Sequence, residues 1–132
     1  MLRGLPASGK TTWALQYIKD NPGTKRVNKD DLRAMLDGGI WSPDNEDFVI
    51  MVRDAIVRLA LSHGHDIIVD DTNLHSKHKN RLWRLASLEN AIVETKSFMD
   101  VEPITCIERD MEREHPVGEE VIWKMFDQLK GI

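Results

Sequence analysis

The sequence predicts an α/β domain with a parallel sheet covered by helices, and three observations lead to that fold class. Short apolar runs alternate with helical patterns along the chain, which is the order of a parallel sheet with right-handed crossovers. No fixed repeat and no Pro/Gly/Ser-rich linker divides the 132 residues, so one domain is expected over 1–132. The composition, 41% hydrophobic and 30% charged, is typical of a globular protein.

The first half of the chain predicts three helices and a strand. A helix over Lys10–Asp20 ends at a Pro-Gly breaker, and the apolar stripe of the third helix has a period near 3.6. The remaining expected elements are a strand at Thr24–Asn28, a helix over Asp30–Leu36 and a helix over Asp44–His63. The stripe consists of Phe48, Met51, Val52, Ala55, Ile56, Leu59 and Ala60.

The second half continues the alternation. Ile67–Val69 is a short apolar run of the kind found in strands that are covered on both faces. The elements expected after it are a helix over Lys77–Leu88, a strand at Ala91–Met99, a helix over Glu102–Glu114 and a helix over Gly118–Leu129.

Composition excludes several classes of protein. No apolar run approaches the roughly 18 residues of a membrane-spanning helix, and no signal-peptide pattern opens the chain, so no membrane partner is expected. The single cysteine, Cys106, suits a reducing compartment, and a cytoplasmic location is the default expectation. A net charge of −4 argues against a broad nucleic-acid-binding face, so any polyanion has to be bound by local basic groups.

The segment from Gly4 to Thr11 matches the G-x-x-x-x-G-K-[ST] pattern of a phosphate-binding loop, the P-loop, at every fixed position and opens a helix. Backbone N–H groups in such a loop point at phosphate oxygens, and the helix N-terminus adds positive partial charge. We therefore expect Lys10 to reach the β- and γ-phosphates of ATP and Thr11 to bind Mg²⁺. The predicted ATP-binding residues of this segment are Gly4, Pro6, Ala7, Ser8, Gly9, Lys10, Thr11 and Thr12.

A P-loop normally follows a central strand, yet only Met1, Leu2 and Arg3 precede Gly4. The sequence thus predicts a first strand that is truncated at the N-terminus.

Asp30 and Asp31 lie where the second predicted strand ends, and either carboxylate could accept the proton of a phosphoryl acceptor. Arg33 follows Asp30 by three residues, so both side chains can face one pocket, with Arg33 binding an anion. The alternative is that Asp30 only caps the next helix.

Asp70, Asp71, Thr72 and Asn73 follow the strand that should lie beside the P-loop strand. A carboxylate there can hold the Mg²⁺ shell, and the polar side chains can bind an acceptor phosphate. A simple Asx-type turn would give the same local sequence.

Arg109 and Arg113 are four residues apart and share one face of the fifth predicted helix. Such arginines can neutralise the charge that develops on a transferred phosphoryl group. The alternative is an exposed helix with salt bridges, because acidic residues alternate with the two arginines.

These elements together resemble the 5′-hydroxyl polynucleotide kinase family, the phage-type repair kinases and their bacterial relatives, over nearly the whole chain. The similar segments are the P-loop through Ala14, Asn28–Arg33, Asp71–Leu74 and the pair Arg109 and Arg113. Lys29 stands where the family pattern has Arg.

The resemblance implies a P-loop kinase-like three-layer αβα sandwich with a four-stranded parallel sheet in the order 2-3-1-4 and a lid at about 105–118. It implies transfer of the ATP γ-phosphate, with Mg²⁺, to the 5′-hydroxyl end of DNA or RNA. The implied catalytic residues are Lys10, Asp30, Arg109 and Arg113; the acceptor-binding residues are Asp30, Arg33, Asp71, Thr72 and Asn73; Thr11 and Asp71 would bind the metal.

The resemblance also leaves open a phosphatase or ligase domain beyond Ile132, and a homo-oligomer remains open. Two other functions stay open at this point: a P-loop kinase of a small hydroxylated metabolite or nucleotide, and a regulatory ATP-binding or NTPase module.

Overall fold

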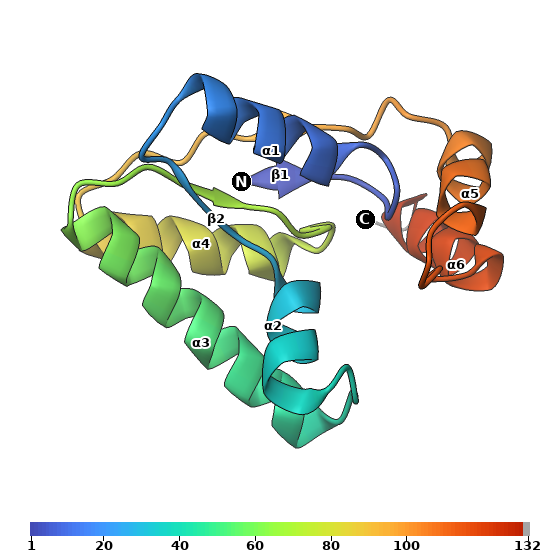
Figure 1. Ribbon diagram of the computed structural model, residues 1–132, viewed down its shortest axis with the longest axis horizontal. Coiled ribbons are helices and arrows are strands. Elements are labelled where there is room, and N and C mark those ends of the chain that lie inside the picture. Colours follow the sequence, from blue (N-terminus) through green and yellow to red (C-terminus); the bar gives the residue numbers. More distant parts are fainter. Residues whose placement is uncertain (131–132) are drawn as a thin grey trace.

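The computed structural model describes residues 1–130, with the side chain of Lys130 left out, as an α/β fold whose helices flank short parallel strands (Figure 1). Its elements are β1 (Leu2–Arg3), α1 (Lys10–Asp20), β2 (Lys25–Val27), α2 (Lys29–Asp37), α3 (Pro43–Ser62), β3 (Ile67–Val69), α4 (Ser76–Leu88), β4 (Lys96–Ser97), α5 (Pro103–Met111) and α6 (Glu119–Lys130). Over this part of the chain, no helix combines the length and the apolar composition that crossing a bilayer requires.

The strands form two parallel pairs. β2 pairs with β3, with Arg26 opposite Ile68, and β1 pairs with β4, with Leu2 opposite Lys96. Just beyond the ends of β1 and β3, the Gly4 N–H donates to the Thr72 carbonyl at 3.0 Å. This bond links the two pairs, but the structure assigns no strand pairing between β1 and β3 within residues 1–130, so the continuous order 2-3-1-4 stays a prediction.

Buried side chains form one cluster on each side of the strands and a third around α5 and α6. In β3, Ile68 packs with Leu2 and with Ala14 of α1, whereas Val69 packs on the opposite side against α3 and α4. This alternation follows from the two-residue period of a strand. Figure 1 shows α1 on one side of the strands and α3 and α4 on the other.

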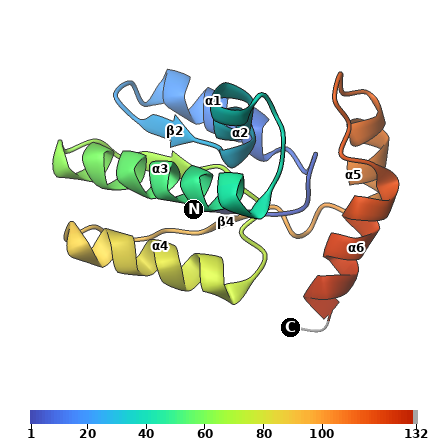
Figure 2. The same ribbon diagram turned by 90° about the horizontal axis from the view of Figure 1, so that it is seen from below.

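α5 and α6 pack against each other as a separate pair at one side of the molecule (Figure 2). Their shared core contains Cys106 and Ile122 and also takes in Leu5 from the P-loop. The turn between them is held by the buried carboxylate of Asp110, which accepts hydrogen bonds from the backbone N–H groups of residues 117 and 118 at 2.9 and 2.8 Å. The predicted lid at about 105–118 covers most of α5 and the turn to α6, and the α5–α6 pair contacts the P-loop through Leu5.

The strand predicted at Ala91–Met99 is wrong over most of its length, because only Lys96–Ser97 is paired. Ile92, which belongs to the unpaired part of the predicted strand, is 90% exposed. Because β1 has only the residues Leu2 and Arg3, β4 can pair with it only over Lys96 and Ser97.

The buried face of α3 also differs from the predicted stripe. Phe48, Met51 and Leu59 are exposed, and the buried positions are Val49, Arg53, Val57 and Ala60. The helix is rotated relative to the expectation, and one consequence is that an arginine enters the interior.

Candidate active site

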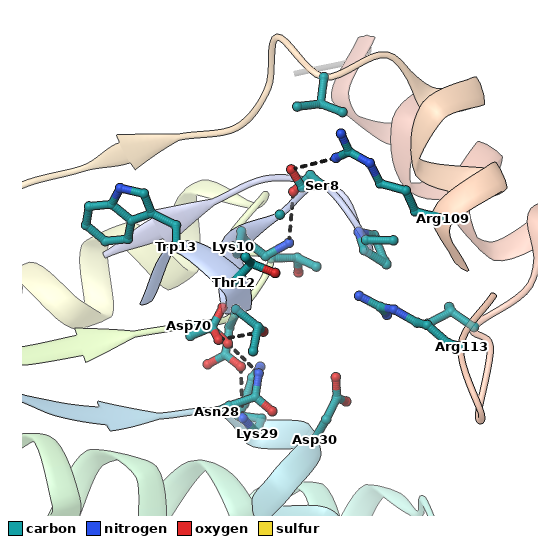
Figure 3. Close-up of a pocket in the computed structure, with 18 of the residues that line it drawn as sticks. Ser8, Lys10, Thr12, Trp13, Asn28, Lys29, Asp30, Asp70, Arg109 and Arg113 are labelled. Atoms are coloured by element: carbon teal, nitrogen blue, oxygen red, sulfur yellow. Dashed lines mark hydrogen bonds between the residues drawn. The ribbon is translucent and has the colours of Figure 1, made fainter. Parts of the chain in front are cut away.

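One pocket of about 910 Å³ lies where the strands end and brings most of the predicted site residues together (Figure 3). The predicted residues that line it are Pro6, Ala7, Ser8, Gly9, Lys10, Thr11, Thr12, Asp30, Arg33, Asp71, Thr72, Arg109 and Arg113. Other polar or aromatic residues that line it are Trp13, Gln16, Asn28, Lys29 and Asp70, to which the sequence alone had given no specific role. Two predicted residues, Gly4 and Asn73, lie outside this lining.

The P-loop has the backbone that its sequence requires. Gly9 has φ of +106° directly before α1 begins, a conformation that side chains rarely allow. Gly4 lies outside the lining but has no room for a side chain, since a Cβ there would be 2.8 Å from Ser8 Oγ and 2.9 Å from Phe98 Cβ. The glycine thus permits the loop to pass close to the segment that follows β4.

Lys10 is the most strongly perturbed group of the pocket. Its ammonium donates to the carbonyls of Gly4 and Leu5 at 3.0 and 2.6 Å and to Ser8 Oγ at 3.3 Å. Burial lowers its pKa from 10.5 to about 8, and the nearby Asp70 carboxylate counteracts part of this effect. A phosphate group in the loop would provide the negative charge that the buried ammonium lacks.

Asp70 joins the two halves of the pocket. One of its oxygens accepts hydrogen bonds from Thr11 Oγ1 and Arg26 Nε, both at 2.8 Å, and its backbone carbonyl accepts from the side chain of Asn28. The carboxylate is 1% exposed, and its other oxygen has no hydrogen-bond partner. A hydroxyl next to a buried carboxylate with a free oxygen fits Mg²⁺, which prefers oxygen ligands and takes only one or two from the protein in nucleotide sites.

Asp71, to which we had assigned the metal, lies in a different environment. Its carboxylate accepts from the Lys29 backbone N–H at 2.9 Å and lies 3.8 Å from Arg53 Nη1. Burial raises the pKa of Asp71. The hydrogen bond from the Lys29 N–H and the positive charges of Lys29 and Arg53 oppose this rise in part. The role of Asp71 as a metal ligand stays a prediction, whereas the contact with Thr11 singles out Asp70.

The side of the pocket at which we predicted the acceptor to bind begins at α2. Asn28 caps this helix by accepting from the Asp31 N–H at 3.0 Å, so Asp30 is not the capping residue. The Asp30 side chain is 81% exposed and is paired with Arg33. Arg33 in turn donates two hydrogen bonds to Glu46 of α3, at 2.8 and 2.7 Å, which fixes the guanidinium beside the pocket.

Asn73 does not contribute to the pocket lining, contrary to our expectation of an acceptor-binding residue. Its side chain is buried and donates to the Leu2 carbonyl at 2.7 Å and to the Asp71 carbonyl at 3.3 Å. It also has φ of +48°, a conformation that asparagine tolerates better than most residues. Through its bond to Leu2, Asn73 links the loop after β3 to β1.

The lid supplies both predicted arginines. Arg109 Nη1 donates to the Ser8 carbonyl at 3.3 Å, and Arg113 lies 3.7 Å from Asp110. Figure 3 shows both guanidinium groups entering from the lid side, with Asp30 on another wall of the same pocket. The contact of Arg109 with the P-loop differs from the alternative of an exposed helix whose arginines only pair with neighbouring acids, whereas the pairing of Arg113 with Asp110 agrees with that alternative.

Two features were missed at the sequence level for different reasons. Trp13 stacks on Tyr17 with ring centroids 5.2 Å apart and lines the pocket from α1, but a tryptophan early in a helix carries no specific signal. Arg53 is 1% exposed and bonds to Asp54 at 3.1 and 3.2 Å. Its spacing of four from Val49 and from Val57 was a usable signal, because all three share one helix face.

A glycine-rich loop that opens a helix, a buried lysine on that loop, and lid arginines over it define this chain as a P-loop domain with a kinase-like fold. A comparison with family profiles agrees: a profile described as AAA domain matches residues 1–132, and the chain belongs to this family.

Individual relatives add detail. The chain is 24% identical over 133 residues to an L-seryl-tRNA(Sec) kinase of Methanococcus maripaludis, covering 98% of this chain and 51% of the relative. Among solved structures it is similar to a chain of the Pnkp1/Rnl/Hen1 RNA repair complex, with 28% identity, a TM-score of 0.85, and coverage of 98% of this chain and 43% of that chain. This chain therefore spans about half the length of these proteins.

A third similarity concerns the fold alone. The Mycobacterium tuberculosis APS kinase CysC, solved with AMPPNP and APS, is 14% identical with a TM-score of 0.67, and the match covers 98% of this chain and 95% of that one. Kinases of different acceptors thus share this architecture.

Proposed function

We propose that this domain transfers the γ-phosphate of ATP to the 5′-hydroxyl end of a polynucleotide, DNA or RNA. The observation that carries the proposal is that a triphosphate-binding loop and the paired Asp30 and Arg33 line one pocket. The similarity to a chain of an RNA repair complex, at 28% identity, supports a nucleic acid as the acceptor.

In the proposed reaction, Lys10 binds the β- and γ-phosphates, and Arg109 and Arg113 bind the oxygens of the transferred group. Fixed cations stabilise the transition state because the negative charge is spread over those oxygens as transfer proceeds. The lid arginines enter from the side opposite the P-loop helix, which suits contacts to the γ-phosphate.

Asp30 serves as the general base. It accepts the proton of the 5′-hydroxyl while that oxygen bonds to the γ-phosphorus, and the bond to the β,γ-bridging oxygen breaks and leaves ADP with the electron pair. Arg33 orients Asp30 and binds the phosphate next to the acceptor hydroxyl. Its two bonds to Glu46 restrict the guanidinium to this position.

Mg²⁺ would be held by Thr11 together with a carboxylate at the end of β3, for which Asp70 and Asp71 are the candidates. When bound, the ion would neutralise phosphate charge and orient the triphosphate. Asp71 and Thr72 would line the acceptor side.

We further propose a setting for the domain. The matched structure is an RNA repair complex with Rnl and Hen1, and this chain covers only part of the matched protein. A role in nucleic-acid repair fits that similarity.

The test is transfer of label from γ-labelled ATP to a 5′-hydroxyl oligonucleotide, with a 5′-phosphorylated oligonucleotide as the control substrate. We expect label only on the 5′-hydroxyl end. ATP binding without label on the oligonucleotide would contradict the proposal and favour a small hydroxylated acceptor or a regulatory nucleotide-binding role.

A variant pair tests the base. Asp30→Asn should reduce kcat at least about 100-fold with ATP affinity unchanged, because the base acts only in the transfer step. Asp47→Asn is the matched control, since Asp47 is exposed on α3 and does not line the pocket. Equal kinetics in the two variants would remove Asp30 from the reaction.

A further inference from the structure

A second hollow of about 530 Å³ lies beside the main pocket and shares two of its lining residues, Thr72 and Met125. Thr72 follows the proposed acceptor-side residue Asp71, and Met125 belongs to α6, which packs against α5. Because the same two residues border both spaces, a ligand that occupies the acceptor side can extend into the second hollow.

Part of the lining of this hollow comes from the start of α4. His75, Lys77 and His78 line it there, and its described lining residues include no carboxylate. The pKa of His78 is lowered to about 4, first by burial and then by the positive charges of Lys29, Lys77 and Arg53, so its imidazole is neutral at pH 7. Lys77 therefore supplies the positive charge that favours an anion here, although the whole chain carries a net charge of −4.

Other parts of the lining are apolar. Leu74 and the α6 residues Met125 and Leu129 contribute to it, together with the polar side chain of Gln128. A lining that combines a lysine with apolar side chains suits a ligand with a phosphate and a flat ring, which is the composition of one nucleotide of a single strand.

We propose that this hollow, called the strand subsite from here on, binds the second nucleotide of a single-stranded acceptor, with Lys77 at its phosphodiester and Leu74 and Leu129 at its base. The inference rests on the proposed function and deepens it, because a small hydroxylated metabolite would fill the main pocket and leave the strand subsite unused. The substrate class is then a polynucleotide of at least two nucleotides.

The test compares Lys77→Ala with Lys79→Ala. Both change one exposed lysine on the same helix, but only Lys77 lines the strand subsite. The acceptors are an eight-nucleotide 5′-hydroxyl strand and a nucleoside 3′-monophosphate. Unchanged melting temperatures and ATP affinities in both variants confirm that the changes are local.

We expect Lys77→Ala to raise KM for the eight-nucleotide strand about tenfold, with a much smaller change for the nucleoside 3′-monophosphate. The slope of log KM against log salt for the strand should fall by about one, since one phosphate contact is lost. Lys79→Ala should match the wild type in all three measurements.

Equal KM changes on the two acceptors, or equal behaviour of the two variants, would overturn the strand subsite while leaving the proposed function intact. A wild type that phosphorylates the nucleoside 3′-monophosphate as efficiently as the strand would overturn it as well. A wild type that phosphorylates neither acceptor would instead refute the proposed function.

Discussion

The buried lysine of the P-loop should make the stability of the nucleotide-free protein depend on pH, and Lys10→Met should remove that dependence. The folded protein holds Lys10 with a pKa of about 8, against 10.5 for an ordinary lysine. Between these two values the unfolded chain binds the proton and the folded chain releases it. The free energy of unfolding must therefore rise with pH in this range.

The magnitude follows from the two pKa values. Each pKa unit corresponds to about 1.4 kcal/mol, so the gap is worth about 3 kcal/mol in total, of which about 2.5 kcal/mol develops between pH 7 and pH 10. Lys10 is 8% exposed, so solvent screening reduces this effect little. Below pH 8 the charged lysine destabilises the fold in full.

The assay is urea unfolding of the wild type and of Lys10→Met at pH 7, 8, 9 and 10. The wild-type free energy minus that of the variant should increase by about 2.5 kcal/mol over the series, since all other titrating groups cancel in the difference. Lys19→Met is the matched control, because Lys19 is exposed on the same helix. Saturating ATP should reduce this pH-dependent increase in the wild-type free energy of unfolding, because bound phosphates stabilise the charged lysine.

Parallel curves for the wild type and Lys10→Met would refute the reasoning. They would mean that the three hydrogen bonds to the ammonium offset its burial completely.

Two further predictions concern stability around the site. Arg53→Met should lower the free energy of unfolding by about 3–5 kcal/mol, because it leaves the carboxylates of Asp54 and Asp71 without their buried partner. Urea unfolding measures this loss of stability. Adding Asp71→Asn to the variant should recover part of it, because one unpaired buried carboxylate is then removed. A loss below about 1 kcal/mol would show that the ion pairs of Arg53 contribute little to stability. Asn73→Ala should lower stability by about 1–3 kcal/mol through the lost bond to Leu2 and the positive φ, as thermal unfolding would report. An unchanged acceptor KM in that variant would agree with a structural role for Asn73, and a raised KM would return it to the acceptor site.

The nucleotide-binding half of the site could be predicted closely because its signal is local. Six of the eight residues from Gly4 to Thr11 line the pocket, and the predicted helix over Lys10–Asp20 has the same bounds as α1. Loop and helix start are adjacent in the sequence, so one continuous motif determines both.

The choice between Asp70 and Asp71 could not be made from the sequence. Neighbouring residues at the end of a strand point in different directions, and which one meets Thr11 depends on how β3 lies relative to α1. Arg53 was missed for a different reason. Hydrophobic periodicity assigns an arginine to the solvent side, although its spacing of four from Val49 and from Val57 places it on their helix face. Its acidic partners, the neighbouring Asp54 and Asp71 after β3, are not part of that pattern.

The division of the strands into two pairs suggests how a fold of this kind can change what it phosphorylates. The β1 and β4 pair leads into the P-loop and α5, whereas the β2 and β3 pair leads into Asp30 and Asp71. Under the proposed function, we expect substitutions behind the β2 and β3 pair to affect acceptor binding more than ATP binding. Such modularity would offer an evolutionary route by which similar domains acquire different acceptors, and it makes the segment between β2 and β3 the natural target for redesigning specificity.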